Sequence, residues 1–173
     1  VLIAPTCVYV SAKVEECTTQ VRRVTVNANQ LEPKLFGYGT ETILDHEYVV
    51  MQRLGFNLQF WHAHRSLPSL LESAGLKDDT EAREAVWDAA NDAYATEAPL
   101  MHHPHVISLA AILVGACVVK RRDLRWWFSS LAPPTSVDMK DVWAVASMLL
   151  DTYELCGQPD FTKVAHSILT KKI

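Results

Sequence analysis

The sequence predicts an all-α protein, with a compact helical bundle in its second half and part of a similar bundle in its first half. The 173 residues include only 6 Gly and 8 Pro, which argues against a turn-rich all-β fold. These residues fall between apolar segments, where helices begin and end. Within most segments the apolar residues recur at three- and four-residue spacing. About eight or nine helices are therefore expected.

Composition and charge exclude several classes of protein. Hydrophobic residues make up 49% and charged residues 21%, as in a globular chain rather than a disordered one. The formal charge of -4 disfavours a general nucleic-acid binder. The four cysteines are far apart, which favours a reduced intracellular compartment. The longest apolar run, 106–119, is shorter than the roughly 20 residues that cross a bilayer, so we expect no membrane association.

In the first half, turn residues divide three segments. A helix is expected over Pro5–Glu16, with Pro5 near its start, where a missing N–H does no harm. The segment Thr19–Asn27 fits a helix or a strand. Thr40 is interpreted as the N-cap of a further helix that Gly55 ends. The stretch Asn57–Pro68 has no period and is expected to connect the two halves.

The second half shows stronger patterns. An amphipathic helix is expected over Glu81–Ala98, with Pro99 ending it. The segment His105–Val119 is apolar on nearly every face, so other helices must enclose it. Asp138 is expected to cap a helix whose buried stripe runs from Met139 to Tyr153. A short helix bearing Trp126 and Trp127 is expected after Asp123, and a last one over Phe161–Lys171.

No segment carries a recognisable catalytic motif. The sequence has no GxSxG, P-loop or GxGxxG pattern, so nothing supports an enzyme. Histidines cluster in loops without nearby Cys or paired carboxylates, so solvated loop histidines are favoured over a metal site. We expect neither a metal nor another cofactor. The histidines are His62, His64, His102, His103 and His105.

A basic cluster precedes the tryptophan pair. Arg121, Arg122 and Arg125 stand beside Trp126 and Trp127, a combination that could stack nucleic-acid bases. The alternative is a solvated helix end with both rings in the core. The acidic net charge favours this second interpretation.

One carboxylate lies where an apolar residue is expected. Glu47 shares a helical stripe with Ile43, Met51 and Leu54, which should face the core. A buried carboxylate needs a partner, and Lys13 is one candidate. Either the two form an internal ion pair that ties two helices together, or they form a charged centre in an apolar surface that docks another protein. The residues alone leave both alternatives open.

Several segments, in order, resemble the cyclin family from Val1 to about Leu155. APTCVYVSAKVEE resembles the third helix of a cyclin box, and ILDHEYVVMQRLGFNLQFWHAHRSLPSLL resembles its fifth helix and the link to the second box. NDAYATEAPLMHHPHVISLAAILVGACVV is similar to the start of the second box. DLRWWFSSL and SVDMKDVWAVASMLLDTYEL resemble the cyclin C-like transcriptional members, with cyclin H-like members as second choice.

The resemblance implies two tandem five-helix cyclin boxes. Residues 1–60 would form the C-terminal part of the first box, 61–157 the second, and 158–173 a C-terminal helix or tail. The family's first box begins with two further helices, which we cannot assign here, so this bundle is expected to be N-terminally incomplete and exposed on one side. The resemblance also implies a regulatory subunit without catalysis of its own.

The resemblance assigns a kinase-binding surface to the first half. In cyclins, the Lys of the KVEE motif and the Glu of the fifth helix engage the regulatory helix of the kinase and the loop before it. These positions correspond to Lys13 and Glu47. The surrounding apolar positions correspond to Val10, Val14, Met51, Phe56 and Leu58.

The leading hypothesis is therefore an activating subunit of a transcriptional cyclin-dependent kinase, located in the nucleus. A Mediator-like assembly is a further expected partner, and direct nucleic-acid binding is not expected. The alternative is a cyclin-fold transcription adaptor that binds DNA or the polymerase machinery without a kinase, through the second bundle.

Overall fold

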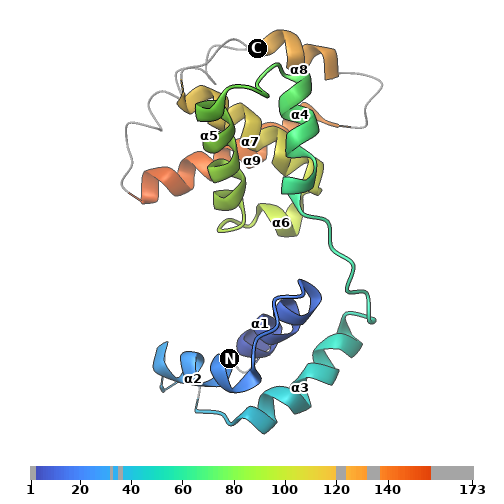
Figure 1. Ribbon diagram of the computed structural model, residues 1–173, viewed down its shortest axis with the longest axis vertical. Coiled ribbons are helices and arrows are strands. Elements are labelled where there is room, and N and C mark those ends of the chain that lie inside the picture. The colour runs from blue at the N-terminus through green and yellow to red at the C-terminus, as the bar shows by residue number, and fades with distance from the viewer. Residues whose placement is uncertain (1–2, 32, 35–36, 120–123, 132–136, 157–173) are drawn as a thin grey trace. The chain divides into compact units, whose positions relative to one another are not determined.

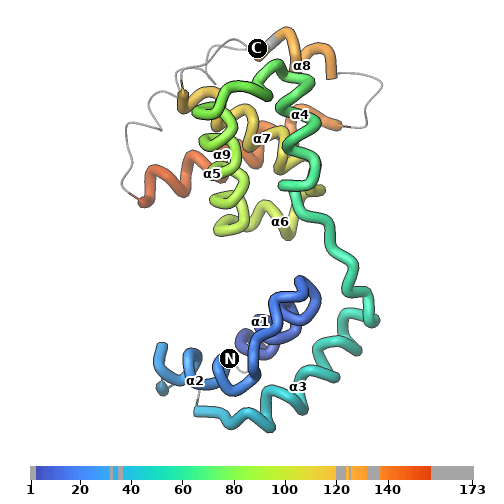
Figure 2. The backbone as a smooth tube through the Cα atoms, in the orientation of Figure 1, coloured from blue at the N-terminus to red at the C-terminus, as the bar shows by residue number. Residues whose placement is uncertain are grey.

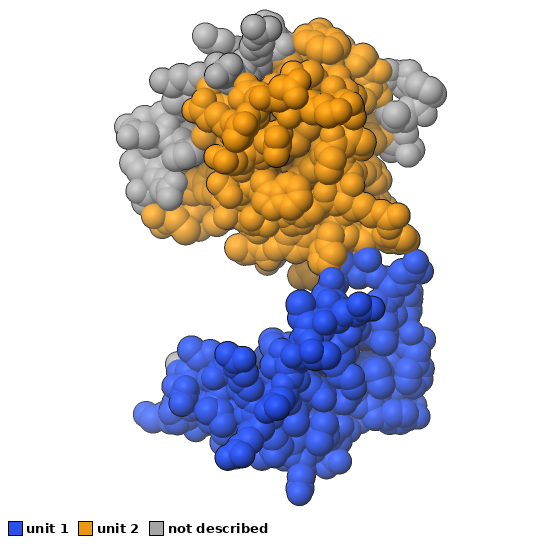
Figure 3. Space-filling model, viewed as in Figure 1, with its two compact units in different colours: residues 1–60 blue, residues 61–173 orange. Residues whose placement is uncertain are grey.

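The computed structural model describes residues 3–31, 33–34, 37–119, 124–131 and 137–156. All regular secondary structure in these ranges is helical, which confirms the all-α class. The chain divides into two compact units, Val1–Phe60 and Trp61–Ile173 (Figure 3). Their assignment to two cyclin boxes stays a prediction, and the expected tail 158–173 lies outside the described residues.

In unit 1, each described helix packs against both of the others. Among its described residues these are α1 (Ile3–Val14), α2 (Val21–Leu31) and α3 (Thr40–Arg53) (Figure 1). The segment that fitted either helix or strand is therefore helical. Among the described residues of this unit, the buried apolar side chains are Pro5 and Val10 of α1, Val24 of α2 and Ile43 of α3.

Unit 2 contains shorter and longer helices around one central helix, as the tube in Figure 2 shows. The first turn is a 3-10 helix, η1. The described elements are η1 (Ala63–Arg65), α4 (Leu67–Ser73), α5 (Thr80–Ala93), α6 (Ala98–Met101), α7 (Pro104–Val118), α8 (Arg125–Leu131) and α9 (Met139–Leu155).

The central helix is α7, which packs against α4, α5, α6 and α9. Every residue from Val106 to Cys117 is buried, so the sequence expectation of an enclosed helix is confirmed. The contact with α5 is close, because a Cβ placed on Gly115 would lie 2.7 Å from the Cα of Val86. Glycine at this position therefore allows the two backbones to approach.

Helix α9 follows the pattern expected from the sequence. The Asp138 carboxylate accepts a hydrogen bond from the backbone N–H of Lys140 at 2.9 Å, which caps the helix as expected. The stripe that faces the core includes Val142, Ala146 and Leu149.

The two tryptophans of α8 differ in their surroundings. Trp127 is buried, and its Nε1–H donates to Ser73 Oγ on α4 at 3.0 Å. Trp126 is exposed. The expectation that both rings belong to the core is wrong for Trp126, because successive residues of a helix point about 100° apart.

Some predicted boundaries are also wrong. The helix expected over 81–98 ends at Ala93, and Pro99 lies inside the first turn of α6. Thr96 Oγ1 accepts the backbone N–H of Ala98 at 3.1 Å, so a side chain starts a new helix where Pro is well tolerated. Thr40 is the first residue of α3, and Gly39 is the N-cap. The expected signals Asp123 and Gly157 lie outside the described ranges.

The segment Ala63–Ser66, near the start of unit 2, is held against α7 by the buried hydroxyl of Ser108. Ser108 Oγ lies 2.8 Å from the carbonyl oxygens of Ala63 and Pro104, and 2.7 Å from Ser66 Oγ. The Tyr94 hydroxyl accepts the backbone N–H of Ala63 at 3.0 Å. These bonds satisfy the polar groups of η1, which the core would otherwise leave unpaired.

Candidate protein-docking site

The two sequence-predicted charges meet between α1 and α3. Lys13 lies in the last turn of α1 and Glu47 in the middle of α3. Lys13 Nζ donates a hydrogen bond to Glu47 Oε1, so the two form an ion pair. The Lys13 side chain is 51% exposed and the Glu47 side chain 13% exposed. The pair therefore presents its ammonium to solvent and shields most of its carboxylate.

The surroundings stabilise the charged form of Lys13. The hydrogen bond to Glu47 raises the pKa of Lys13 above its ordinary value, so the ammonium is protonated at neutral pH. Its Nζ also lies 5.3 Å from the centre of the Tyr9 ring, within cation–π range. Tyr9 was not among the predicted site residues, although its position four residues before Lys13 on one helix is a signal for this contact.

The predicted apolar residues occupy different depths. Val14, Met51 and Leu58 are half-buried, and Phe56 is 53% exposed. Val10 is only 6% exposed, so it packs inside unit 1.

Both helices of this surface end in an unusual backbone conformation. Glu16, just after α1, has φ +56°, and Phe56, just after α3, has φ +55°. Within the described ranges these are the two non-glycine residues with positive φ. Such a conformation costs a non-glycine residue about 1–2 kcal/mol. Strain in unit 1 is therefore concentrated where the two helices of the site end.

Sequence reasoning missed one aromatic residue of the site. Tyr48 is 60% exposed, and its ring centroid lies 6.0 Å from that of Phe56, at an interplanar angle of 60°. The two residues are eight apart, so helical spacing alone gives no clear signal for this contact. The pairing depends on the left-handed turn after α3.

The geometry satisfies both alternatives that the sequence left open. The ion pair ties α1 to α3, because each helix supplies one partner. It also leaves an accessible ammonium on α1, the helix that carries Val14, while α3 and the turn after it carry Met51 and Phe56. Apolar side chains around a small number of charges are typical of protein interfaces.

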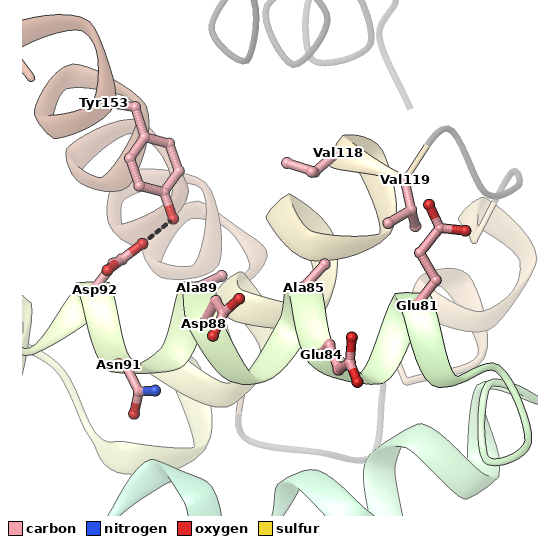
Figure 4. A pocket seen from close by; sticks show the side chains of 10 residues that line it. All are labelled: Glu81, Glu84, Ala85, Asp88, Ala89, Asn91, Asp92, Val118, Val119 and Tyr153. Carbon is pink, nitrogen blue, oxygen red and sulfur yellow. Dashed lines mark hydrogen bonds between the residues drawn. The ribbon is translucent and has the colours of Figure 1, made fainter. Parts of the chain in front are cut away.

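Unit 2 has a groove of different chemistry (Figure 4). It has a volume of about 540 Å³ and lies along α5, bordered by the C-terminal end of α7 and by α9. Four carboxylates line it together with apolar side chains, and none of the described residues that line it is basic. The described part of the lining is therefore acidic. The carboxylates belong to Glu81, Glu84, Asp88 and Asp92.

A hydrogen bond closes one end of this groove. The Tyr153 hydroxyl on α9 donates to Asp92 Oδ2 on α5 at 2.7 Å, drawn as a dashed line in Figure 4. Burial of Tyr153, and then this bond, raise the pKa of its hydroxyl well above the ordinary value. The bond fixes α9 against α5.

The other candidate groups do not form a chemical centre among the described residues. His64 Nε2 lies 2.8 Å from Asn91 Oδ1, and the His64 ring stacks on that of Tyr94. No group of three or more His, Cys, Asp or Glu side chains within the described ranges could hold a metal ion. Arg121 and Arg122 lie outside these ranges. In the same part of the chain, no helix has both the length and the apolar character needed to cross a membrane.

Comparison with known proteins identifies relatives along most of the chain. Cyclin-C1-2 of Arabidopsis thaliana is 36% identical over 154 residues, which cover 88% of this chain and 58% of the relative. Cyclin-C1-1 of Oryza sativa subsp. japonica is 34% identical, with 88% of this chain and 57% of the relative covered. Cyclin-C of Rattus norvegicus is 32% identical, with 99% and 62% covered.

The chain is cyclin C-like. This confirms the resemblance inferred from its segments, with the cyclin C-like members as the first choice. No family model matches the chain. The cyclin C-like chain spans 57–62% of the length of these three curated relatives. The all-helical architecture agrees with a cyclin-box fold.

Proposed function

We propose that this chain is the regulatory subunit that binds and activates a cyclin-dependent kinase, and that it has no catalytic activity of its own. The Lys13–Glu47 ion pair, set across two helices among accessible apolar side chains, is the observation that carries this proposal. The names of its cyclin C relatives support it.

The proposed mechanism is a shift between kinase conformations. A protein kinase is competent only when a Glu of its regulatory helix pairs with the Lys that holds the nucleotide phosphates. A partner that binds the inward position of this helix more tightly than the outward one stabilises the active state. The cyclin C-like chain would supply binding energy, and the kinase would supply all of the chemistry.

The site has groups suited to each part of such a helix. The apolar side chains of Met51, Phe56 and Leu58 would bury against the apolar side of the helix. The Lys13 ammonium can donate to backbone carbonyls, and Glu47 can accept backbone N–H groups. Because Lys13 and Glu47 already neutralise each other, neither is an unpaired charge in the free chain.

The same proposal covers the wider assignments. Residues 1–60 would belong to the first cyclin box and carry the kinase surface, and residues 61–157 would form the second box. The kinase would act in transcription, so the assembly would be nuclear. A Mediator-like complex is the further partner we propose.

Two substitutions test the kinase surface. We expect Glu47→Ala and Val14→Asp each to weaken binding to the kinase by about 2 kcal/mol, or about thirtyfold, as central interface residues often do. The assay measures binding of the 173-residue chain to a panel of purified cyclin-dependent kinase catalytic subunits by calorimetry, and peptide phosphorylation by each mixture. Thermal unfolding of each variant shows that it remains folded.

A matched control is available in unit 2. Glu72 forms an exposed ion pair with Lys77, so Glu72→Ala removes a Lys–Glu pair to which neither α1 nor α3 contributes. This variant should bind and activate the kinase as the parent chain does. Unchanged binding and activation by both Glu47→Ala and Val14→Asp would contradict the proposal. Salt-dependent DNA binding by a chain that binds none of the kinases would favour the adaptor alternative instead.

A further inference from the structure

We propose that Tyr48 is a positioning residue, which holds the Phe56 ring as a preformed apolar anchor for the partner kinase. This inference rests on the proposed function, because it assigns Phe56 to the same docking surface. The pair consists of two half-exposed aromatic rings, 6.0 Å apart, on one side of α3 and its C-terminal turn.

The first argument comes from the backbone. Gly55 and Phe56 both have positive φ, +61° and +55°. Glycine adopts this conformation readily, but a side chain makes it unfavourable. The turn is held by hydrogen bonds from Gly55 N to Gln52 O at 3.0 Å and from Phe56 N to Met51 O at 2.9 Å.

In the free chain, the left-handed conformation of Phe56 is offset by little burial of its side chain. Phe56 remains 53% exposed, so most of the free energy available from burying its ring is unused. Strained residues cluster at functional sites. The strained conformation of Phe56 is therefore expected to serve the binding of a partner rather than the stability of the fold.

The second argument comes from Tyr48. The chain turns after Arg53, the last residue of α3, and the left-handed conformation directs Phe56 back toward the helix. There its ring meets Tyr48 edge-on, an arrangement that aromatic rings favour. Because Tyr48 sits on a regular helix, it limits the positions that the Phe56 ring can take.

The third argument is continuity with the charged pair. Met51 lies one turn after Glu47 on the same face of α3, and the Phe56 N–H donates to the carbonyl oxygen of Met51. Tyr48 directly follows Glu47, and its side chain points about 100° away around the helix. The aromatic pair therefore sits at a fixed spacing from the ion pair along α3. A ring held in its bound position before association reduces the ordering cost of binding. In the complex, the Phe56 ring would contact an apolar side chain of the same kinase, beside the groups that Lys13 and Glu47 engage.

A double-mutant cycle tests this coupling. The variants are Tyr48→Ala, Phe56→Ala and the double substitution, with affinity measured for the purified kinase that binds the parent chain. Loss of an aromatic pair corresponds to about a threefold to tenfold change in an equilibrium constant. We therefore expect Tyr48→Ala to weaken the affinity for the kinase by this factor. If Tyr48 acts through Phe56, the double variant binds no more weakly than Phe56→Ala alone. Tyr48→Phe should restore the parent affinity.

Additive effects of the two substitutions would overturn the inference, because each ring would then act independently. Unchanged affinity of Tyr48→Ala would overturn it as well. Tyr38→Ala is the control, since Tyr38 is another exposed aromatic residue of unit 1, and it should leave affinity unchanged.

Phe56→Gly separates binding from folding. Glycine removes the strain at φ +55°, so the melting temperature should stay the same or rise, while affinity for the kinase falls about tenfold or more. A clear fall in the melting temperature would show that the ring serves the fold, and would overturn the inference.

The Glu47→Ala variant keeps the two proposals distinct. If Glu47→Ala weakens kinase binding as expected and the Tyr48 variants do not change it, the positioning role fails and the kinase surface stands. If the parent chain binds no kinase in the panel, the proposed function itself fails.

Discussion

The two units of this chain use their apolar residues in different ways. In unit 2, α7 is buried from Val106 to Cys117, and large side chains such as Trp127, Phe128 and Ile112 are almost fully enclosed. In unit 1, the buried apolar side chains among the described residues are Pro5, Val10, Val24 and Ile43. Many others on α1, α2 and α3 are exposed. They include Ile3, Val8, Val26, Leu31, Leu44, Tyr48 and Val49.

This difference indicates that the two units contribute unequally to the stability of the chain. Burial of apolar surface is the main stabilising contribution to folding, so unit 2 has a much larger reserve of stability than unit 1. In unit 1, several apolar side chains are instead exposed, and Phe56 of the proposed kinase surface is one of them. The accessible ion pair and both strained helix ends lie in unit 1 as well.

The largest expected effect is at the centre of unit 1. Ile43 is the large side chain that unit 1 buries most completely, and Ile43→Ala should destabilise this unit by about 3 kcal/mol. Because the core of unit 1 is small, amide hydrogen exchange should then rise across α1, α2 and α3 and stay low in α7. The neighbouring Leu44→Ala removes an exposed side chain and should change exchange little. Equal protection losses in both units would contradict the comparison.

A smaller effect is expected at the closest helix contact of unit 2. Gly115→Ala places a methyl group 2.7 Å from backbone atoms of Val86, which cannot move as a flexible side chain does. The overlap should outweigh the higher helix propensity of Ala, with a net loss of about 2 kcal/mol in chemical denaturation. Gly37→Ala is the control, because a Cβ there meets nothing within 4 Å. A neutral Gly115→Ala would show that α5 and α7 are packed less tightly than described.

The mildest test compares cysteines in the native chain. Burial raises the pKa of Cys117 in α7 to about 11, whereas Cys7 and Cys17 of unit 1 are exposed. Because the thiolate is the reactive form, iodoacetamide at pH 8 should alkylate Cys7 and Cys17 at least tenfold faster than Cys117. Mass spectrometry of peptides measures each rate, and urea should remove the difference. Rapid labelling of Cys117 without urea would mean that the core of unit 2 opens readily.

Sequence patterns predicted the parts of the fold that depend on regular periodicity. The apolar run of α7, the buried stripe of α9 and the Asp138 cap were all confirmed, because each depends on local spacing. The contact between Lys13 and Glu47 was proposed because a carboxylate on an apolar stripe needs a partner.

The features that were missed depend on non-local or irregular structure. The end of α5 at Ala93 depends on a turn stabilised by Thr96, which helical periodicity does not encode. The pairing of Tyr48 with Phe56 depends on a left-handed residue that is usually glycine.

Exchanging the two charges tests the central claim most directly. Lys13→Glu combined with Glu47→Lys keeps an ion pair between α1 and α3 but reverses the charges offered to a partner. We predict that the double variant unfolds at a temperature within a few degrees of the parent chain, yet binds the kinase at least thirtyfold more weakly. Parent-like kinase affinity in this variant would show that the pair serves only to hold two helices together, and would contradict the account.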